Sequence, residues 1–163
     1  VLENMMVAQH NKLMTASGFS ILGLINSKSY LQKEKEAMEI SKYWLDIIGL
    51  TNRADDNAGD LPYGDQRKLE IVRAMCIEPK LLCLDEPAAG LNAKESAELN
   101  KLLKFIKNDK KTGILLIEHD MSVVMGISDH VVVLNYGKKI FEGTAKETKN
   151  SPEVIEAYLG TED

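Results

Sequence analysis

The first half of the chain repeats apolar residues at helical spacing. In residues 1–10 and 31–48, apolar side chains recur every three or four positions, which predicts two amphipathic helices. Between them, residues 11–30 contain Gly, Ser and Asn together with an apolar patch and indicate a connector. Gly49 is a suitable end for the second helix, because glycine readily adopts the left-handed conformation found at helix ends.

A polar loop over 51–60 precedes a third helix, which we expect over 61–77. Beyond that helix the pattern changes. The short apolar runs at 81–84 and 114–117 are typical of strands buried on both faces, and an amphipathic helix over 93–108 separates them. This strand–helix–strand spacing predicts a parallel crossover.

The last third of the chain predicts smaller elements. A short helix is expected over 121–128, followed by a hairpin whose strands, 131–134 and 139–141, are joined around the Tyr-Gly pair at 136–137. A final helix is expected over 151–159, because Ser and Pro at its start are favoured first residues of a helix.

Composition narrows the class of protein. The 163 residues include 20 Lys and Arg against 25 Asp and Glu, a net charge of −5, and 44% are hydrophobic, which excludes wholesale disorder. A pI near 5.3 argues against a nucleic-acid partner, whose phosphates need a basic face. No apolar stretch reaches the roughly 20 residues that a membrane-spanning helix needs. Cys76 and Cys83 have neither disulfide-framework nor zinc-site spacing, which favours a reducing, cytoplasmic compartment.

Three groups of residues could carry chemistry. Asp85 and Glu86 follow the first predicted strand, where one carboxylate can hold Mg²⁺ through water and the other can activate a water molecule. His119 follows the second strand and could contact a phosphate. The turn at 62–66 opens a helix, whose N-terminus can bind an anion. Taken singly, the first two features are more often a solvated acidic turn and a structural histidine, and many helices begin like the third without binding anything.

Together, their order and spacing resemble the ATP-binding-cassette (ABC) family. The matching motifs are the Walker B strand (81–85) with the following Glu86, the D-loop (88–92, ending in Asn92), the switch histidine (His119) and the signature loop (Pro62, Tyr63, Gly64 and Asp65). The resemblance implies an α/β fold, the C-terminal part of an ABC-type P-loop NTPase domain. It would comprise a helical subdomain over 1–77 and a partial parallel sheet with a terminal hairpin over 78–163.

The residues of these motifs are similar to those of one branch of that family. The strings LPYGDQRKLEIVRAM, LLCLDEPAAGLN and ILLIEHDMSVVMGISD resemble the ATP-binding subunits of bacterial branched-chain amino acid importers, and the likeness runs over nearly the whole chain. It implies ATP and Mg²⁺ as cofactors, a second ATP-binding subunit and transmembrane permease subunits as partners, and a place on the inner face of the plasma membrane. ATP would lie between two subunits, with Asp85 holding Mg²⁺, Glu86 and His119 acting on one side, and the signature loop of the other subunit facing the γ-phosphate.

Two departures from the family pattern change the expectation. Asp65 stands where the signature loop usually has Gln, and its carboxylate should repel a triphosphate unless its side chain turns away. The 163 residues contain no G-x-x-x-x-G-K-[ST] phosphate loop and no Q-loop. We therefore expect the C-terminal part of such a subunit, inactive in ATP hydrolysis by itself. The strand at 114–117 would then be a sheet edge, and the chain should self-associate and bury it, either by edge-to-edge pairing or by exchange of a helix such as 1–10.

Two other functions fit parts of the pattern. The chain could be the head of a non-transport ABC ATPase of DNA repair or chromosome maintenance, although it has no coiled-coil arms and is acidic. It could also be a non-catalytic remnant that binds a partner. The apolar connector at 13–25 either packs on the helical subdomain or, through residues 19–25, docks onto membrane partners.

Overall fold

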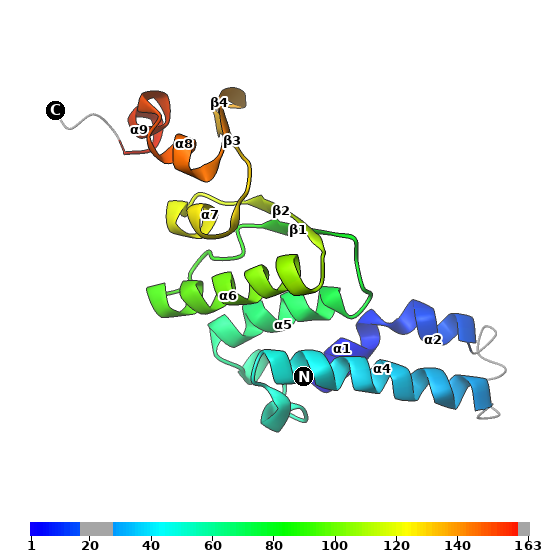
Figure 1. The fold of residues 1–163 in the computed structure, drawn as a ribbon. Helices are drawn as coiled ribbons and strands as arrows, with labels where there is room; N and C mark the ends of the chain where they lie inside the picture. The colour runs from blue at the N-terminus through cyan, green and yellow to red at the C-terminus, as the bar shows by residue number, and fades with distance from the viewer. Residues whose placement is uncertain (17–27, 160–163) are drawn as a thin grey trace. The chain divides into compact units, whose positions relative to one another are not determined.

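The computed structural model describes residues 1–16 and 28–159 (Figure 1). The chain divides into two compact units, Val1–Leu82 and Cys83–Asp163. The domains expected from the sequence, 1–77 and 78–163, remain a prediction. The described helices of the first unit are α1 (Leu2–Ala8), α2 (His10–Ala16), α4 (Lys28–Ile47) and α5 (Tyr63–Met75), with 3₁₀ turns at Thr51–Arg53 and Ala58–Asp60.

The first unit is built around α4, which contacts α1, α2 and α5. Leu45 of α4 and Val72 of α5 are fully buried in this core. Gln9, between α1 and α2, is also buried, and its side-chain amide donates to the carbonyl of Ala37 at 2.9 Å and to Ser41 Oγ at 3.0 Å. The hydrogen bonds of Gln9 therefore hold the junction between α1 and α2 against α4.

The first unit differs from expectation at several helix boundaries. Residues 11–16 are helical rather than part of a connector, because α2 contains no Gly or Pro and packs against α4. The next helix already begins at Lys28, and α5 ends at Met75 rather than Ile77. The apolar patch at 19–25 lies outside the described residues.

The second unit combines two small sheets with helices. β1 (Leu81–Asp85) runs into it from the end of the first unit. The remaining elements are α6 (Ala93–Asp109), β2 (Gly113–Ile117), α7 (Met121–Ile127), β3 (Val131–Asn135), β4 (Lys138–Gly143), α8 (Ala145–Lys149) and α9 (Pro152–Leu159). β1 and β2 form one two-stranded sheet and are joined through α6, a connection of the kind that parallel strands need.

The expected hairpin is confirmed as β3 and β4, which pair antiparallel with Val131 opposite Gly143. Its two-residue turn consists of Tyr136 and Gly137, at φ 45° and 75°. Positive φ at both positions is what a type I′ turn requires. The helix α8 after the hairpin was not expected, and it begins with a reciprocal capping box between Thr144 and Glu147.

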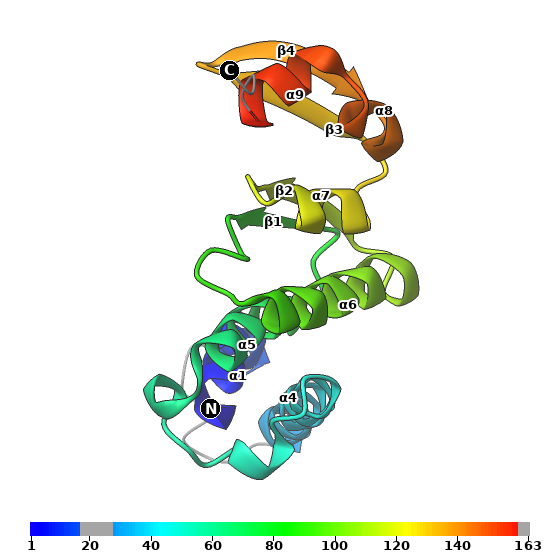
Figure 2. The same cartoon turned by 90° about the vertical axis from the view of Figure 1, so that its left-hand side faces the viewer.

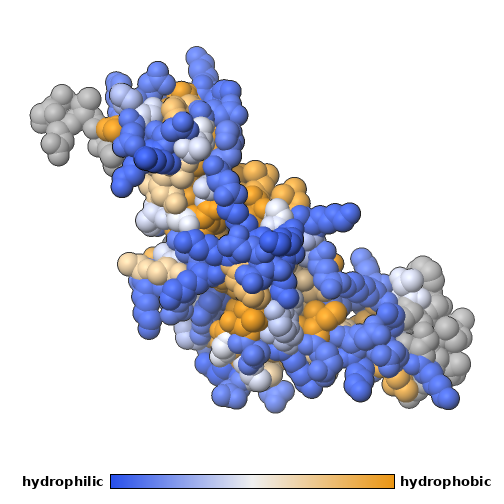
Figure 3. Space-filling model, viewed as in Figure 1, coloured by the Kyte–Doolittle hydropathy of each residue, from blue (hydrophilic) through white to orange (hydrophobic). Residues whose placement is uncertain are grey.

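The expectation that both central strands are buried on two faces is wrong. In β1 only Leu82 is buried, and in β2 the side chains of Leu115 and Ile117 are 55% and 58% exposed. α6 lies along one side of this sheet in both views (Figures 1 and 2). Alternate side chains on the other side stay at the surface, and Figure 3 shows apolar surface in the region of β2. Continuous apolar runs are buried on both faces only where both faces are covered.

Candidate functional site

The carboxyl ends of β1 and β2 bring Glu86 and His119 together. The Glu86 N–H donates to the carbonyl of Ile117 at 2.9 Å, which carries the strand pairing one residue beyond β1. Glu86 Oε1 then lies 3.3 Å from His119 Nδ1, and both side chains are more than half exposed. Glu86 has φ 45°, an uncommon conformation for a residue with a side chain and one that often marks a functional site.

Asp85 is the exposed last residue of β1, next to Glu86. Within the described residues no group of three or more His, Cys, Asp and Glu side chains could enclose a metal ion. Mg²⁺ does not need such a cage, because it usually keeps several waters and takes one or two carboxylates together with substrate phosphates. The accessible carboxylate of Asp85 therefore fits Mg²⁺ bound beside a nucleotide.

Asn92 serves as the N-cap of α6. Its side-chain Oδ1 accepts from the N–H groups of Lys94 and Glu95 at 3.0 and 3.1 Å, and the Glu95 carboxylate accepts from the Asn92 N–H at 3.0 Å. This reciprocal capping box satisfies backbone donors that the helix cannot pair itself. From the sequence we expected Asn92 to contact nucleotide as part of the D-loop, and we did not predict that it caps α6.

Glu118 was not singled out from the sequence, yet its carboxylate binds three backbone N–H groups. One oxygen accepts from Ala88 at 2.7 Å, and the other accepts from His119 and Asp120 at 3.1 and 3.3 Å. The only sequence signal was its place directly before a strand-end histidine.

Asp120 begins α7 immediately after His119. Its carboxylate accepts from the hydroxyl of Ser122 at 2.6 Å and from the N–H groups of Ser122 and Val123. These hydrogen bonds, the hydroxyl first among them, hold the pKa of Asp120 below its ordinary value. The Asp120 carboxylate therefore caps the start of α7 next to the histidine.

The predicted signature loop belongs to the first unit, where it forms the start of α5. Pro62 is the N-cap and supplies no capping side chain, Gly64 is buried, and the Tyr63 hydroxyl accepts from Arg67 at 2.6 Å. Asp65 forms an ion pair with Lys68, one turn along, at 2.8 Å. The charge expected to repel a phosphate is therefore compensated within the helix.

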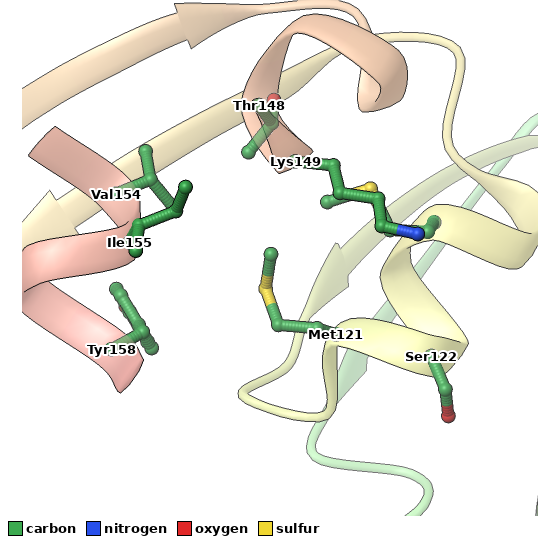
Figure 4. A pocket seen from close by; sticks show the side chains of 8 residues that line it. Met121, Ser122, Thr148, Lys149, Val154, Ile155 and Tyr158 are labelled. Carbon is green, nitrogen blue, oxygen red and sulfur yellow. The ribbon is translucent and has the colours of Figure 1, made fainter. Parts of the chain in front are cut away.

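A further hollow lies in the second unit between α7, α8 and α9 (Figure 4). It measures about 280 Å³ and is lined by Met121, Ser122, Met125, Thr148, Lys149, Val154, Ile155 and Tyr158. Its walls are mostly apolar, and the Tyr158 hydroxyl donates to the carbonyl of Leu134 at 3.1 Å. The hollow thus lies between the helix that follows His119 and the two C-terminal helices.

The family model described as ABC transporter matches residues 2–89, more than half of the chain. The chain belongs to the ABC transporter family. A second model, described as branched-chain amino acid ATP-binding cassette transporter, matches residues 138–163. The family and the α/β fold class expected from the sequence are therefore confirmed.

The curated relatives are longer than this chain. The chain is 49% identical over 160 residues to the high-affinity branched-chain amino acid transport ATP-binding protein LivG of Escherichia coli K12, covering 98% of this chain and 62% of LivG. It is 46% identical to the corresponding protein BraF of Pseudomonas aeruginosa, covering 97% of this chain and 61% of BraF. The chain thus spans about three fifths of their length.

Solved structures agree on the fold. An ATP-binding cassette of an ABC transporter in its ADP conformation superposes with a TM-score of 0.76 at 30% identity, covering 98% of this chain and 62% of that one. A nucleotide-free ATP-binding cassette gives a TM-score of 0.72 at 29% identity and the same coverage. Across residues 1–16 and 28–159, no helix combines the length and apolar character needed to cross a membrane.

Proposed function

We propose that this chain forms part of an ATP-binding subunit of an ABC importer for branched-chain amino acids. The observation that carries the proposal is the contact of 3.3 Å between Glu86 and His119, beside Asp85, at the ends of two adjacent strands. The names of LivG and BraF, and the match of the C-terminal segment to the branched-chain model, support the substrate class.

The proposed roles follow from the chemistry of each group. Asp85 would hold Mg²⁺ through water, and the ion would supply positive charge beside the phosphates. The exposed Glu86 carboxylate would take the proton of the attacking water. His119 turns Nδ1 toward Glu86, so Nε2 is the ring nitrogen left to contact the γ-phosphate.

The other half of the proposed site is supplied in trans. The signature loop, Pro62 to Asp65, would present the positive end of α5 to nucleotide held by a second ATP-binding subunit, with Asn92 at the same subunit contact. Transmembrane permease subunits would complete the importer at the inner face of the plasma membrane. Without a phosphate loop among its 163 residues, the chain by itself should not hydrolyse ATP.

We also propose that the chain self-associates through the β1–β2 sheet. Among the described residues β1 is the only strand next to β2, and Cys83, Leu115 and Ile117 are exposed on the sheet. An apolar edge of this kind favours pairing with another chain. Light scattering after size-exclusion chromatography should give a mass above that of the 18.1 kDa monomer, and a monomer at all concentrations would contradict the proposal.

The importer function is tested with a chimera. The part of E. coli LivG that this chain does not span is joined to the chain and expressed in a strain lacking LivG. We expect leucine uptake to return, to be lost with Glu86→Gln and to persist with Glu156→Gln, which changes an exposed glutamate on α9. ATP hydrolysis without uptake would contradict the importer assignment, and Glu86→Gln with normal hydrolysis would contradict the role of Glu86.

A further inference from the structure

The side chain of Glu118 joins the loops that follow β1 and β2. Its Oε1 accepts from the Ala88 N–H at 2.7 Å, across the two loops. Its Oε2 accepts from the N–H groups of His119 and Asp120, at 3.1 and 3.3 Å, within its own loop. The residue is half-buried, which strengthens these charge-assisted hydrogen bonds.

These bonds lie directly beside the two reactive side chains. Ala88 is two residues after Glu86, whose backbone is held at φ 45°, and Glu118 is the neighbour of His119. An unfavourable backbone conformation persists only where the surrounding structure holds it. The bond from the Glu86 N–H to Ile117 fixes the start of this loop, and Glu118 fixes its continuation.

We propose that Glu118 is a positioning residue. It holds the loop carrying Glu86 against the segment carrying His119 and so keeps Glu86 Oε1 within hydrogen-bond reach of His119 Nδ1. Its benefit to ATP hydrolysis rests on the proposed function. The juxtaposition itself needs no nucleotide and is tested without one, so failure of the chimera and failure of this proposal are distinguishable.

Amide hydrogen exchange, followed by NMR on the 163-residue chain, gives the first measurement. Glu118→Gln leaves one acceptor oxygen where the carboxylate has two, so an NH₂ group faces at least one backbone donor. We expect exchange to quicken at least about tenfold at Ala88 or at the pair His119 and Asp120, since hydrogen bonds to charged groups are the stronger ones. The control Glu156→Gln, on α9, should leave all three amides unchanged.

The tautomer of His119 gives the second measurement. A carboxylate only accepts, so the contact with Glu86 places the proton of the neutral ring on Nδ1. Long-range ¹H–¹⁵N spectra should show this tautomer in the parent chain and a mixture with the Nε2–H form in Glu118→Gln. If that variant does not fold, Glu118→Asp is measured instead, because its shorter side chain cannot reach all three N–H groups together.

Two results would overturn the proposal. Unchanged exchange at all three amides would show that the carboxylate does not hold the loops. Faster exchange with an unchanged His119 tautomer would show that Glu118 stabilises backbone without positioning the two side chains.

Discussion

Replacing Asn92 separates the stability of α6 from contact with a nucleotide. Asn92→Ala removes the acceptor for the N–H groups of Lys94 and Glu95 and leaves only the bond that the backbone N–H of residue 92 donates to the Glu95 carboxylate. Losing such an N-cap costs about 1 kcal/mol, within a range of about 0.5–2 kcal/mol. One kcal/mol corresponds to about a fivefold change in the equilibrium between folded and unfolded forms.

Hydrogen exchange of the α6 amides measures this change directly. Exchange through opening of α6 should quicken about fivefold in Asn92→Ala, while amides of α4, in the other unit, keep their rates. Asn92→Asp and Asn92→Ser retain an acceptor and should match the parent chain, and Asn92→Gly should cost only a few tenths of a kcal/mol. Thr144→Ala, which removes the equivalent cap of α8, is the matched control and should leave α6 unaffected.

The same series isolates the proposed nucleotide contact. The cap uses Oδ1, so Nδ2 stays available to a second subunit. Asn92→Ser should therefore keep α6 stable and still lower leucine uptake in the chimera. If Asn92→Ala leaves α6 exchange unchanged, the capping argument is refuted. Full uptake with Asn92→Ser would restrict Asn92 to its structural role.

Three further predictions concern the chain alone. It should release no phosphate from ATP above the level of Glu86→Gln, and turnover that this substitution abolishes would contradict the need for a phosphate loop. In dilute solution that keeps the chain monomeric, iodoacetamide at pH 8 should label the exposed Cys83 quickly and Cys76 only on unfolding, because burial raises the pKa of Cys76 to about 11; equal labelling rates of the two thiols would count against this. Asp65→Gln should destabilise the first unit by about 0.5–1 kcal/mol, since it removes both an ion pair and a favourable helix-start charge, in urea unfolding followed by Trp44 fluorescence. Glu70→Gln breaks a comparable ion pair with Arg67 that lies away from the helix start, and it should lower the stability of the first unit by less. If both substitutions lower the stability equally, the charge of Asp65 at the helix start contributes nothing.

The sequence predicted elements best where one pattern dominates locally. The hairpin follows from alternating residues around Tyr136 and Gly137, and both turn residues have the positive φ that such a short connection requires. The sequence placed Glu86 and His119 after two predicted strands, and the structure brings them to 3.3 Å because the carboxyl ends of neighbouring strands lie at one edge of the sheet.

Other features depend on contacts that periodicity does not encode. Leu115 and Ile117 are exposed because their side of the sheet is not covered. An apolar run has the same pattern whether one or both faces of its strand are covered, so the sequence does not distinguish the two. The helicity of 11–16 depends on packing against α4. Helix α8 was predictable, because Thr144 and Glu147 have capping-box spacing, yet a stretch this short carries no amphipathic repeat.

The charge of the predicted nucleotide contacts is set by local pairing rather than by residue type. Asp65 read as a repulsive carboxylate, but Lys68 lies one helical turn away and binds it at 2.8 Å, so the pair adds no net charge beside the start of α5. Glu118 adds a further carboxylate to the loops at the strand ends, but that carboxylate accepts hydrogen bonds from three backbone N–H groups. The carboxylates left accessible at the strand ends are therefore Asp85 and Glu86, the two to which the proposed function assigns Mg²⁺ and the attacking water.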